Sequence, residues 1–474
     1  MIHIALIDTV VIVVYLILMM LVGFYFSKKI KSSTDFYIAG RSLGMFTVTA
    51  TVCATMIGGG ALVGRGGVMY AQGAVGIWLA LPYFIGMIFF SMISGRIHKI
   101  GVKYDIISIP DLMERRYGKT AKILVASLVA FTMMATVGAQ ISATATILKI
   151  VGMQWGITYQ TGALIATIIF IVYTSASGLY GVVYTDVIQF IVLILSVYIA
   201  VPIIALFKVG GVGQLVNAIP SDMWNLKPDA TIVGYIFTNL VFTLAGAEIW
   251  QRAFASKNAR VAQRGTLFGT LIYGLTIIST FIIALCAVVI IPDLFEVYGT
   301  YDAAVPALVL KTLPVGLVGI TIAGLLSVLM SSSDSYLLIS TQTITNDIIR
   351  TLKEDITDKQ IILLSRIIIP MLGFLALIIA LYIKSAYAAL MFAWTFYASS
   401  VGLPAFAALY WKKATKYAVV LSVITGFVSS CAWELAGRPF GIASSIVGSV
   451  LCGIVLYTVG ILTYKKGEGI FLDV

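Results

Sequence analysis

Residues 315–348 read VGLVGITIAGLLSVLMSSSDSYLLISTQTITNDI, an apolar run that carries at its centre the cluster Ser331-Ser332-Ser333-Asp334-Ser335. The run is long enough to cross a bilayer, whose core holds no water to solvate four hydroxyls and a carboxylate. Hydroxyls and carboxylates are hard oxygen donors that suit a small cation, and an ionisable residue inside a membrane helix usually marks a functional site. The segment therefore predicts a cation site within a membrane helix.

The composition of the whole chain agrees with a membrane location. Of its 474 residues, 60% are hydrophobic and only 11% are charged, and the mean hydropathy is +1.04. A soluble domain of this composition would expose too much apolar surface. Long apolar runs predict an all-α membrane protein with thirteen transmembrane helices, at about residues 5–27, 44–71, 75–99, 120–151, 156–174, 180–207, 231–253, 265–291, 315–348, 360–383, 388–411, 416–437 and 443–465.

The positive charges are distributed unevenly between the two sides of this predicted arrangement. The formal net charge is +11, and most of the 31 Lys and Arg residues fall in the loops of one side. Basic loops face the cytoplasm, so we predict a multi-pass protein of the cell membrane with its amino terminus outside and its carboxyl terminus inside. Charges divided among short loops do not form one binding face, which argues against a nucleic-acid partner.

The sequence offers no visible parts for catalysis. Cys53, Cys286, Cys431 and Cys452 all lie in apolar runs, without the spacing or the histidines of a zinc site. A Ser/His/Asp set and a phosphate-binding glycine loop are missing as well. We therefore expect no enzyme activity and no organic cofactor. The expected partners are the lipid bilayer and a small-molecule solute, with no obligatory protein partner, and an ion gradient is the remaining source of energy.

A glycine-rich segment, ATMIGGGALVGRGG at residues 54–67, is the second unusual feature. Six of the ten residues from Gly58 to Gly67 are glycines, each of which weakens a helix by about 1 kcal/mol relative to alanine. We expect the helix to break here and to leave backbone carbonyls free, which is tolerated at membrane depth only beside a cavity or an ion. The alternative is that Gly60 and Gly64 allow close helix packing.

Several short motifs follow one another along nearly the whole chain: DFYIAGRSLG at 35–44, the glycine-rich segment, SIPDL at 108–112, RYG at 116–118, GLYGVVYTDVIQ at 178–189, WQR at 250–252, the cluster at 331–335 and YWKKAT at 410–415. In this order they resemble the motifs of the sodium:solute symporter family, whose members carry sugars, proline, pantothenate and other small solutes.

The resemblance implies a single integral membrane domain, residues 1–474, with a core of two inverted five-helix repeats as in the leucine-transporter-like fold. The first repeat would cover residues 44–207 and the second residues 231–411. One peripheral helix, 5–27, would precede the repeats and two helices, in 416–465, would follow them. It also implies a secondary active transporter that couples inward sodium flow to uptake of a small organic solute by alternating access.

The resemblance further implies where cations bind. A sodium site, for the transported coupling ion, would use carbonyls of the broken helix and the carbonyl and hydroxyls of the later one: Ala54, Ile57, Val328, Ser331 and Ser332. A second site, present in some members, would use Asp186, Ser331, Asp334 and Ser335. Because Asp334 replaces a hydroxyl of those members, it either strengthens cation binding or holds a proton. Alternatively, Asp186 lies near the cytoplasmic end of its helix, where it caps the helix or pairs with a loop arginine.

The solute site is less well defined by the sequence. Gln140, Asn239 and Thr243 are polar residues in apolar surroundings, equally compatible with solute binding and with ordinary interhelical hydrogen bonds. Arg65 follows the glycine-rich break and is a candidate for binding a substrate carboxylate. Alternatively, the Arg65 side chain points to the outer vestibule or pairs with a protein carboxylate. Glu248 precedes Arg252 by four residues, a spacing that favours a helix-stabilising pair.

Two other functions are compatible with this pattern. Asp186 or Asp334 would support a proton-coupled solute symporter, and the same fold would serve a transporter-like membrane sensor. The sequence leaves open which solute is carried, which ion drives transport and in what ratio.

Overall fold

The computed structural model describes residues 4–27, 37–353, 355–465 and 471–473 and, within these, all side chains except those of residues 176–180. Asp35 and Phe36 of the motif at 35–44 lie outside the described residues. The described chain is helical and contains no strand, only one isolated bridge between Leu43 and Ser256. The predicted all-α class is confirmed.

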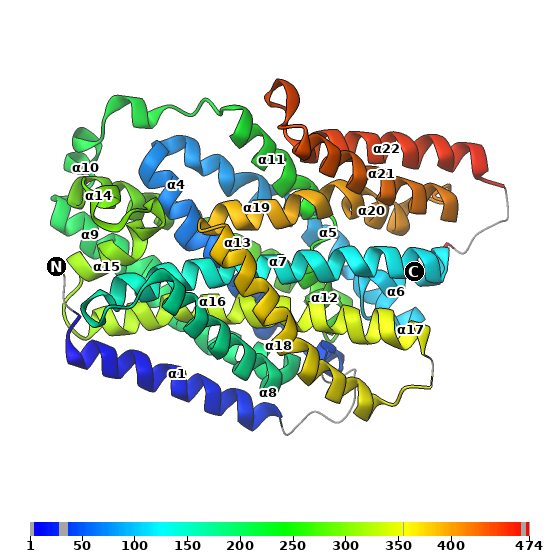
Figure 1. The fold of residues 1–474 in the computed structure, drawn as a ribbon, viewed down its shortest axis with the longest axis horizontal. Coiled ribbons are helices and arrows are strands. Elements are labelled where there is room, and N and C mark those ends of the chain that lie inside the picture. The colour runs from blue at the N-terminus through cyan, green and yellow to red at the C-terminus, as the bar shows by residue number, and fades with distance from the viewer. Residues whose placement is uncertain (1–3, 28–36, 354, 466–470, 474) are drawn as a thin grey trace.

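The α-helices follow one another along the whole chain (Figure 1). They are α1 Leu6–Ser27, α3 Met45–Met56, α4 Arg65–Gln72, α5 Leu81–Tyr104, α6 Ile109–Tyr117, α7 Lys119–Val151, α8 Tyr159–Leu193, α9 Val201–Val209, α10 Val212–Ala218, α11 Ala230–Phe242, α12 Ala247–Ala255, α13 Ala259–Ile290, α14 Leu294–Tyr298, α15 Ala304–Thr312, α16 Leu317–Gln342, α17 Arg350–Leu352, α18 Asp358–Tyr382, α19 Ala386–Tyr397, α20 Leu403–Tyr410, α21 Lys416–Leu435 and α22 Ser444–Thr463.

Short 3₁₀ and π segments join these helices. The 3₁₀ segments are η1 Ala39–Arg41, η3 Gly73–Leu79, η4 Met153–Trp155, η6 Ser221–Trp224, η7 Tyr301–Ala303 and η10 Pro439–Gly441. The π segments are η2 Gly60–Gly64, η5 Ile194–Ala200, η8 Thr343–Ile349 and η9 Ala398–Gly402. Single π turns inside helices are often found at functional sites.

Among the described residues, eleven helices are long and apolar enough to cross a membrane. The expected spans 44–71 and 156–174 contain the two shorter apolar helices Met45–Met56 and Tyr159–Ser175. The chain is therefore a multi-pass membrane protein, while thirteen crossings remain a prediction.

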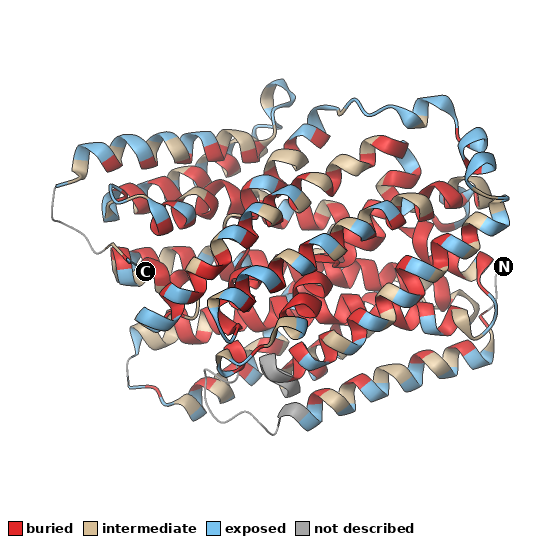
Figure 2. Ribbon diagram, turned by 180° about the vertical axis from the view of Figure 1, so that it is seen from behind, coloured by how far each residue is buried: buried red, intermediate tan, exposed pale blue. Residues whose placement is uncertain are grey.

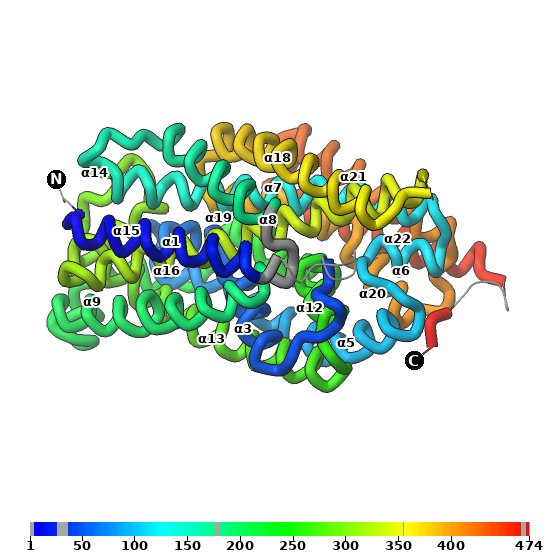
Figure 3. The backbone as a smooth tube through the Cα atoms, turned by 90° about the horizontal axis from the view of Figure 1, so that it is seen from below, coloured from blue at the N-terminus to red at the C-terminus, as the bar shows by residue number. Residues whose placement is uncertain are grey.

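The helices run roughly along the longest axis of the molecule, with the amino terminus near one end of that axis and the carboxyl terminus in the opposite half (Figures 1 and 3). In the most apolar part of the span that contains α16, 89% of the residues are buried, against 22% in α1. Figure 2 shows the same contrast between the buried centre and the exposed outer helices. Helix α16 with its polar cluster therefore lies at the centre of the bundle. The apolar side chains that project from the outer helices suit a lipid environment.

The predicted break in the second span is present. Helix α3 ends at Met56, Ile57 has non-helical angles (φ −95°, ψ 57°), and the chain returns to helix through η2 and α4. The alternative explanation of the glycines also applies, because a Cβ at Gly60 would lie 2.5 Å from Leu390 and one at Gly64 would lie 2.7 Å from the backbone nitrogen of Tyr387. The glycines therefore allow both the break and the close approach of α19.

A second break was not predicted from the sequence. The expected span 231–253 is divided into α11 and α12 by residues 243–246, and Gly246 has φ −56° and ψ 105°. The two broken helices open the two expected repeats, residues 44–207 and 231–411. This placement suits an inverted-repeat architecture, and the division into repeats remains a prediction.

Candidate functional site

The cluster at 331–335 lies near the middle of α16, and all five side chains are buried. Because consecutive residues of an α-helix are rotated by about 100° about the helix axis, five consecutive side chains face several neighbouring helices. Ser331 and Asp334 contact α8, Ser332 faces the break after α3, and Ser335 contacts α12. Ser333 instead donates to the carbonyl of Leu329 in its own helix.

The Ser332 hydroxyl lies beside the break. A Cβ built on Gly58 would be 3.3 Å from Ser332 Oγ, and that hydroxyl is fully buried without a hydrogen-bond partner. On the other side, the Ile57 N–H donates to the Cys53 carbonyl, and the carbonyls of Ala54 to Met56 belong to the last turn of α3, beyond which the helix does not continue. Carbonyl oxygens and an unpartnered hydroxyl are suitable ligands for a small hard cation.

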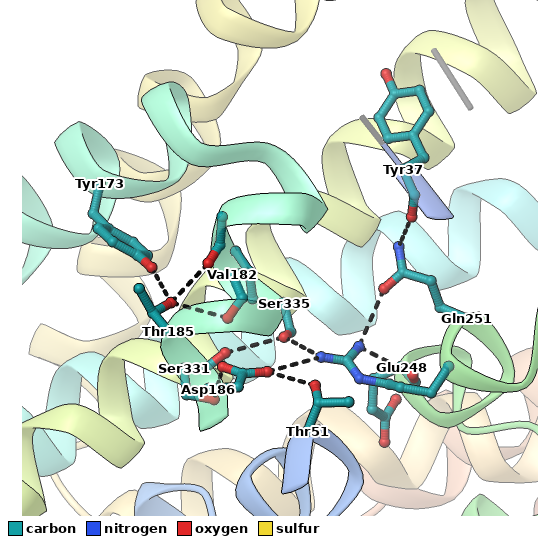
Figure 4. A network of polar contacts seen from close by, with 12 residues as sticks. Tyr37, Thr51, Tyr173, Val182, Thr185, Asp186, Glu248, Gln251, Ser331 and Ser335 are labelled. Carbon is teal, nitrogen blue, oxygen red and sulfur yellow. Dashed lines mark hydrogen bonds and ion pairs between the residues drawn. The ribbon is translucent and has the colours of Figure 1, made fainter. Parts of the chain in front are cut away.

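Asp186 lies next to this break and is completely buried. Ser331 Oγ and Thr51 Oγ1 each donate to it at 2.5 Å (Figure 4). Arg252 Nη2 lies 3.8 Å from Asp186 Oδ2 and donates to Ser335 Oγ at 2.5 Å. The guanidinium group thus lies at the position where the resemblance placed a second cation. Asp186 does pair with an arginine, but this arginine belongs to the membrane helix α12 and not to a loop.

Asp334 makes a different contact from the other members of the predicted second site. Thr174 Oγ1 donates to Asp334 Oδ1 at 2.6 Å, and Asp334 Oδ2 is buried without a partner. The structure therefore brings Asp186, Ser331 and Ser335 together around Arg252 and directs Asp334 toward Thr174 on α8.

The predicted solute residues have separate positions. Gln140 lies at the first break, where its Oε1 accepts from the Gly59 N–H at 2.6 Å. Asn239 Nδ2 donates to the Tyr235 carbonyl at 2.7 Å, and its Oδ1 is buried without a partner. Thr243 donates to the Leu240 carbonyl and packs against Gly86 of α5, as an ordinary residue of a helix interface does.

Arg65 is 3% exposed at the start of α4. Its Nη1 donates to the Tyr273 hydroxyl, its Cζ lies 5.6 Å from the centre of the Tyr273 ring, and its Nε has no partner. None of the ion pairs formed by the described residues includes Arg65. Arg65 is thus buried and forms no ion pair with a described carboxylate, and its role in solute binding remains a prediction.

Glu248 follows the second break and does not form the expected pair with Arg252. Arg252 Nη1 donates to the Glu248 backbone carbonyl at 3.1 Å, whereas both carboxylate oxygens of Glu248 are buried without a partner (Figure 4). The guanidinium is directed instead to Asp186 and Ser335. Sequence reasoning missed this arrangement. Gly246, two residues before Glu248, was the one local signal.

Two interrupted membrane helices, with a buried oxygen-donor set beside one break, define the class of ion-coupled secondary transporters. The model of the Sodium:solute symporter family matches residues 36–426, and the chain belongs to this family. The predicted resemblance is confirmed, and with it the predicted function of sodium-coupled solute uptake at the level of the family. The family is one of transporters.

Known proteins resemble the chain along nearly its full length. The high-affinity proline transporter PutP of Bacillus subtilis (strain 168) is 25% identical over 466 residues, covering 95% of this chain and 97% of that protein. The osmoregulated proline transporter OpuE of the same strain is 24% identical, covering 96% and 94%. The sodium/proline symporter of Staphylococcus aureus is 23% identical, covering 98% and 94%.

Solved structures show the same fold. A substrate-bound, outward-open Na⁺-coupled sialic acid symporter has a TM-score of 0.83 and 18% identity, covering 99% of this chain and 100% of that one. The nucleobase-cation-symport-1 family transporter MHP1 has a TM-score of 0.58 and 13% identity, covering 91% and 96%.

Proposed function

We propose that this symporter lies in the cytoplasmic membrane, amino terminus outside, and binds one sodium ion between α3 and α16. The ligands would be the carbonyls of Ala54, Ile57 and Val328 and the hydroxyls of Ser331 and Ser332. The observation that carries the proposal is the buried, unpartnered Ser332 hydroxyl facing the break. An ion at this place joins a helix of the first repeat to one of the second, so its binding favours one relative position of the repeats.

Arg252 affects how many cations can bind. In the present arrangement its guanidinium group forms an ion pair with Asp186 and donates a hydrogen bond to the Ser335 hydroxyl. A second sodium ion at Asp186, Asp334 and Ser335 would require Arg252 to move away, since two cations cannot share this position. We propose that such a site forms only after a movement of α12, and that the resting state binds one ion.

The proposed solute carries a carboxylate, which Arg65 binds. A buried guanidinium without a carboxylate partner can offer its free N–H groups to a ligand oxygen. The three relatives described above are proline transporters, and proline has a carboxylate. Gln140 and Asn239, each with an unpartnered buried atom, are proposed to contribute polar contacts. Thr243, whose hydroxyl is satisfied, is the least supported of the four candidates.

The test is uptake into proteoliposomes of labelled amino acids, monocarboxylates and sugars, under an inward sodium gradient, an inward proton gradient or no gradient. We expect sodium-driven accumulation of one solute. Ser332→Ala should raise the sodium concentration for half-maximal uptake about ten-fold, because a lost cation ligand is worth about 1.4 kcal/mol or more. Ser333→Ala is the matched control, since its hydroxyl is satisfied within α16.

Proton coupling is the second candidate, and one observation favours it: Asp334 Oδ2 is buried without a partner, where it can carry a proton. Accumulation that responds only to the proton gradient, and is lost in Asp334→Asn, would replace the sodium proposal. Accumulation driven by sodium in Asp334→Asn would remove the proton candidate.

A further inference from the structure

In the half of the molecule that holds the carboxyl terminus (Figure 1), several segments enclose a pocket of about 210 Å³. They are the end of α6, the connection from α20 to α21 with the first turn of α21, the end of α22 and the tail residue Phe471. Of the ten described lining residues four are basic and none is acidic. The basic ones are Arg116, Lys412, Lys416 and Lys465. The pocket therefore favours an anion.

The acidic side chains of α6, the helix that supplies Arg116, are engaged elsewhere. Asp111 and Glu114 both pair with Lys122, at 3.0 and 2.6 Å. None of the ion pairs formed by the described residues includes Lys412 or Lys416. Both of these lysines are exposed, and their long flexible side chains can turn toward a ligand in the pocket.

Tyr117 provides an independent observation at the same pocket. Its side chain is 4% exposed, and its hydroxyl is buried without a hydrogen-bond partner. The preceding residue, Arg116, holds this wall in place, because its Nη1 donates to the carbonyls of Ala407 and Ala408 at 2.8 and 2.7 Å. A buried hydroxyl without a partner is unfavourable, and an acceptor oxygen of a bound ligand would satisfy it.

The start of α21 adds hydrogen-bond donors. Thr415 caps this helix, since its side chain accepts from the Ala418 N–H at 3.3 Å. The first N–H groups of a helix, here those of Lys416 and Tyr417, have no carbonyl partner within the helix, and the helix dipole favours an anion beside them. Thr415 Oγ1 also lies 2.6 Å from Thr463 Oγ1, which joins the start of α21 to the end of α22. Ammonium groups, backbone N–H groups and a hydroxyl together suit a phosphate group.

The position of the pocket indicates where such a phosphate comes from. Both α21 and α22 are apolar enough to cross a membrane, and the pocket lies at the ends of these two spans. Tyr417 and Leu462, beside the pocket, are 67% and 83% exposed, and Trp411 stacks on Tyr457 with ring centres 5.9 Å apart. Exposed apolar and aromatic side chains at the end of a span are typical of the membrane interface, where lipid head groups lie.

We propose that this pocket binds the phosphate group of an anionic phospholipid, with Lys412, Lys416 and Lys465 around the head group and the Tyr117 hydroxyl donating to a phosphate oxygen. Basic pockets between membrane helices are known to bind anionic head groups. The acyl chains would lie along the exposed faces of α21 and α22. The bound lipid would hold the ends of α6, α21 and α22 together. This site is separate from the proposed ion and solute sites, so its test does not depend on transport.

The first experiment measures lipid retention by the purified full-length protein in a neutral detergent, using native mass spectrometry. Phosphatidylglycerol and phosphatidylcholine with the same acyl chains carry the same phosphodiester, but only the first has a net negative charge. We expect phosphatidylglycerol to bind at least about ten-fold more tightly, because several lysines attract its charge. Equal retention of the two lipids would overturn the proposal.

Inorganic phosphate is the arm for a soluble ligand. Titrated into the lipid-free protein, it should bind at least about ten-fold more weakly than phosphatidylglycerol, because it gains no contact with α21 and α22 through acyl chains. Phosphate binding as tight as that of the lipid would assign the pocket to a free anion and overturn the lipid proposal.

The second experiment locates the site. The combined variant Lys412→Gln, Lys416→Gln, Lys465→Gln should weaken phosphatidylglycerol binding at least about ten-fold and leave phosphatidylcholine binding unchanged. The matched control removes the same charge from exposed lysines outside the pocket: Lys99→Gln, Lys257→Gln, Lys353→Gln. Equal losses in the two variants would show that only net charge matters, and the pocket would not be the site. If the combined variant does not fold, Lys416→Glu is compared with Lys353→Glu in the same way.

Tyr117→Phe tests the hydroxyl without changing the shape of the side chain. We expect phosphatidylglycerol to bind about three-fold more weakly or worse, because a hydrogen bond to a charged oxygen is lost. A tyrosine with a purely structural role would lose nothing, since its hydroxyl has no partner in the protein. Tyr457→Phe, at a position outside the pocket lining, is the control. Unchanged lipid binding in Tyr117→Phe would refute the role given to this hydroxyl.

Discussion

Asp186 and Arg252 form the described ion pair that lies deepest in the molecule, with side chains 0% and 1% exposed. Such pairs contribute little net stability, because desolvation of both charges offsets their attraction. Their separation is a different matter, since the remaining charge stays buried without a partner. The pair therefore resists the loss of either member, and the proposed movement of α12 would have to provide Arg252 with another partner.

We predict that Asp186→Asn destabilises the protein by roughly 3–5 kcal/mol, because the Arg252 guanidinium loses its counter-charge in a buried position. The double variant Asp186→Asn, Arg252→Gln should recover part of this loss. Thermal unfolding of the purified protein in detergent, arranged as a double-mutant cycle, measures the coupling. If the effects of the two single variants simply add, the pair is not coupled and the prediction is wrong.

Asp302, in the 3₁₀ segment η7 outside the spans, gives a pH prediction. Burial raises the pKa of this carboxyl from 3.8 to about 6, although the Ala386 N–H donates to it at 2.9 Å. Because the folded state binds the proton more tightly, the stability from this group is complete below about pH 4 and is lost as the pH rises through about 6. Two pKa units correspond to about 3 kcal/mol.

The measurement for Asp302 is the unfolding temperature between pH 4 and pH 8, for the protein and for Asp302→Asn. We expect the variant to show a smaller decrease in stability between pH 4 and pH 7, because asparagine stays neutral. Asp222→Asn, at an exposed position in η6, is the control and should follow the unchanged protein. Equal pH profiles for all three would show that Asp302 does not titrate between the folded and unfolded states as argued.

At this scale, sequence reasoning located residues better than it located their partners. The polar run at 331–335 and the glycines at 58–67 are local signals, and the structure places Ser332 of the first beside Gly58 of the second, at the candidate site. The contacts that decide their roles are long-range: Asp186 with Arg252, Asp334 with Thr174, Arg65 with Tyr273. No pattern in the sequence predicts which buried polar groups meet across the bundle.

At the scale of elements, the two helix breaks differed in how well they could be predicted. Six glycines in ten residues make a helix unfavourable, so the first break was visible. The second lies in the apolar run Phe242-Thr243-Leu244-Ala245-Gly246, where the chain leaves the helix with angles open to any residue type. Local propensity therefore does not account for this break, and we attribute it to the tertiary packing of α11 and α12. The hydropathy pattern alone predicts one continuous span.

Gly64 tests how closely η2 and α19 must approach. A Cβ there would lie 2.7 Å from the backbone nitrogen of Tyr387 and 2.8 Å from its Cβ. Backbone atoms cannot turn aside as a flexible side chain does, so Gly64→Ala should separate the two elements and destabilise the protein by about 1–3 kcal/mol, with loss of uptake.

Gly213 in α10 is the matched control for Gly64. A Cβ at this position meets nothing within 4 Å, so Gly213→Ala should be neutral or slightly stabilising, by about 0.5–1 kcal/mol. The unfolding temperature and the initial uptake rate of both variants are the measurements. Similar behaviour of the two variants would mean that the approach of η2 to α19 is not tight.

At the scale of the whole molecule, the fold class, the membrane location and the family could all be inferred from composition and motifs, because hydropathy is a property of the sequence alone. The predicted thirteen crossings remain a prediction, since α3 is too short to count as a span by length alone and the apolar stretch Gly60–Tyr104 includes parts of two expected spans. The orientation of the protein in the membrane is predicted from the distribution of basic residues, and it can be tested at both ends of the helix bundle.

We predict that the end of the molecule containing α10 and η6 faces outward and that the end containing α17 faces the cytoplasm (Figure 1), because the basic loops lie at the latter. Cysteines introduced singly at Asp222 and at Asp358, in a background without the native cysteines, report the two ends. A membrane-impermeant maleimide should label Asp222→Cys in intact cells and Asp358→Cys only after permeabilisation. The reverse pattern would contradict the predicted orientation but leave the proposed uptake unchanged, because the sodium gradient, and not the orientation of the protein, sets the direction of symport.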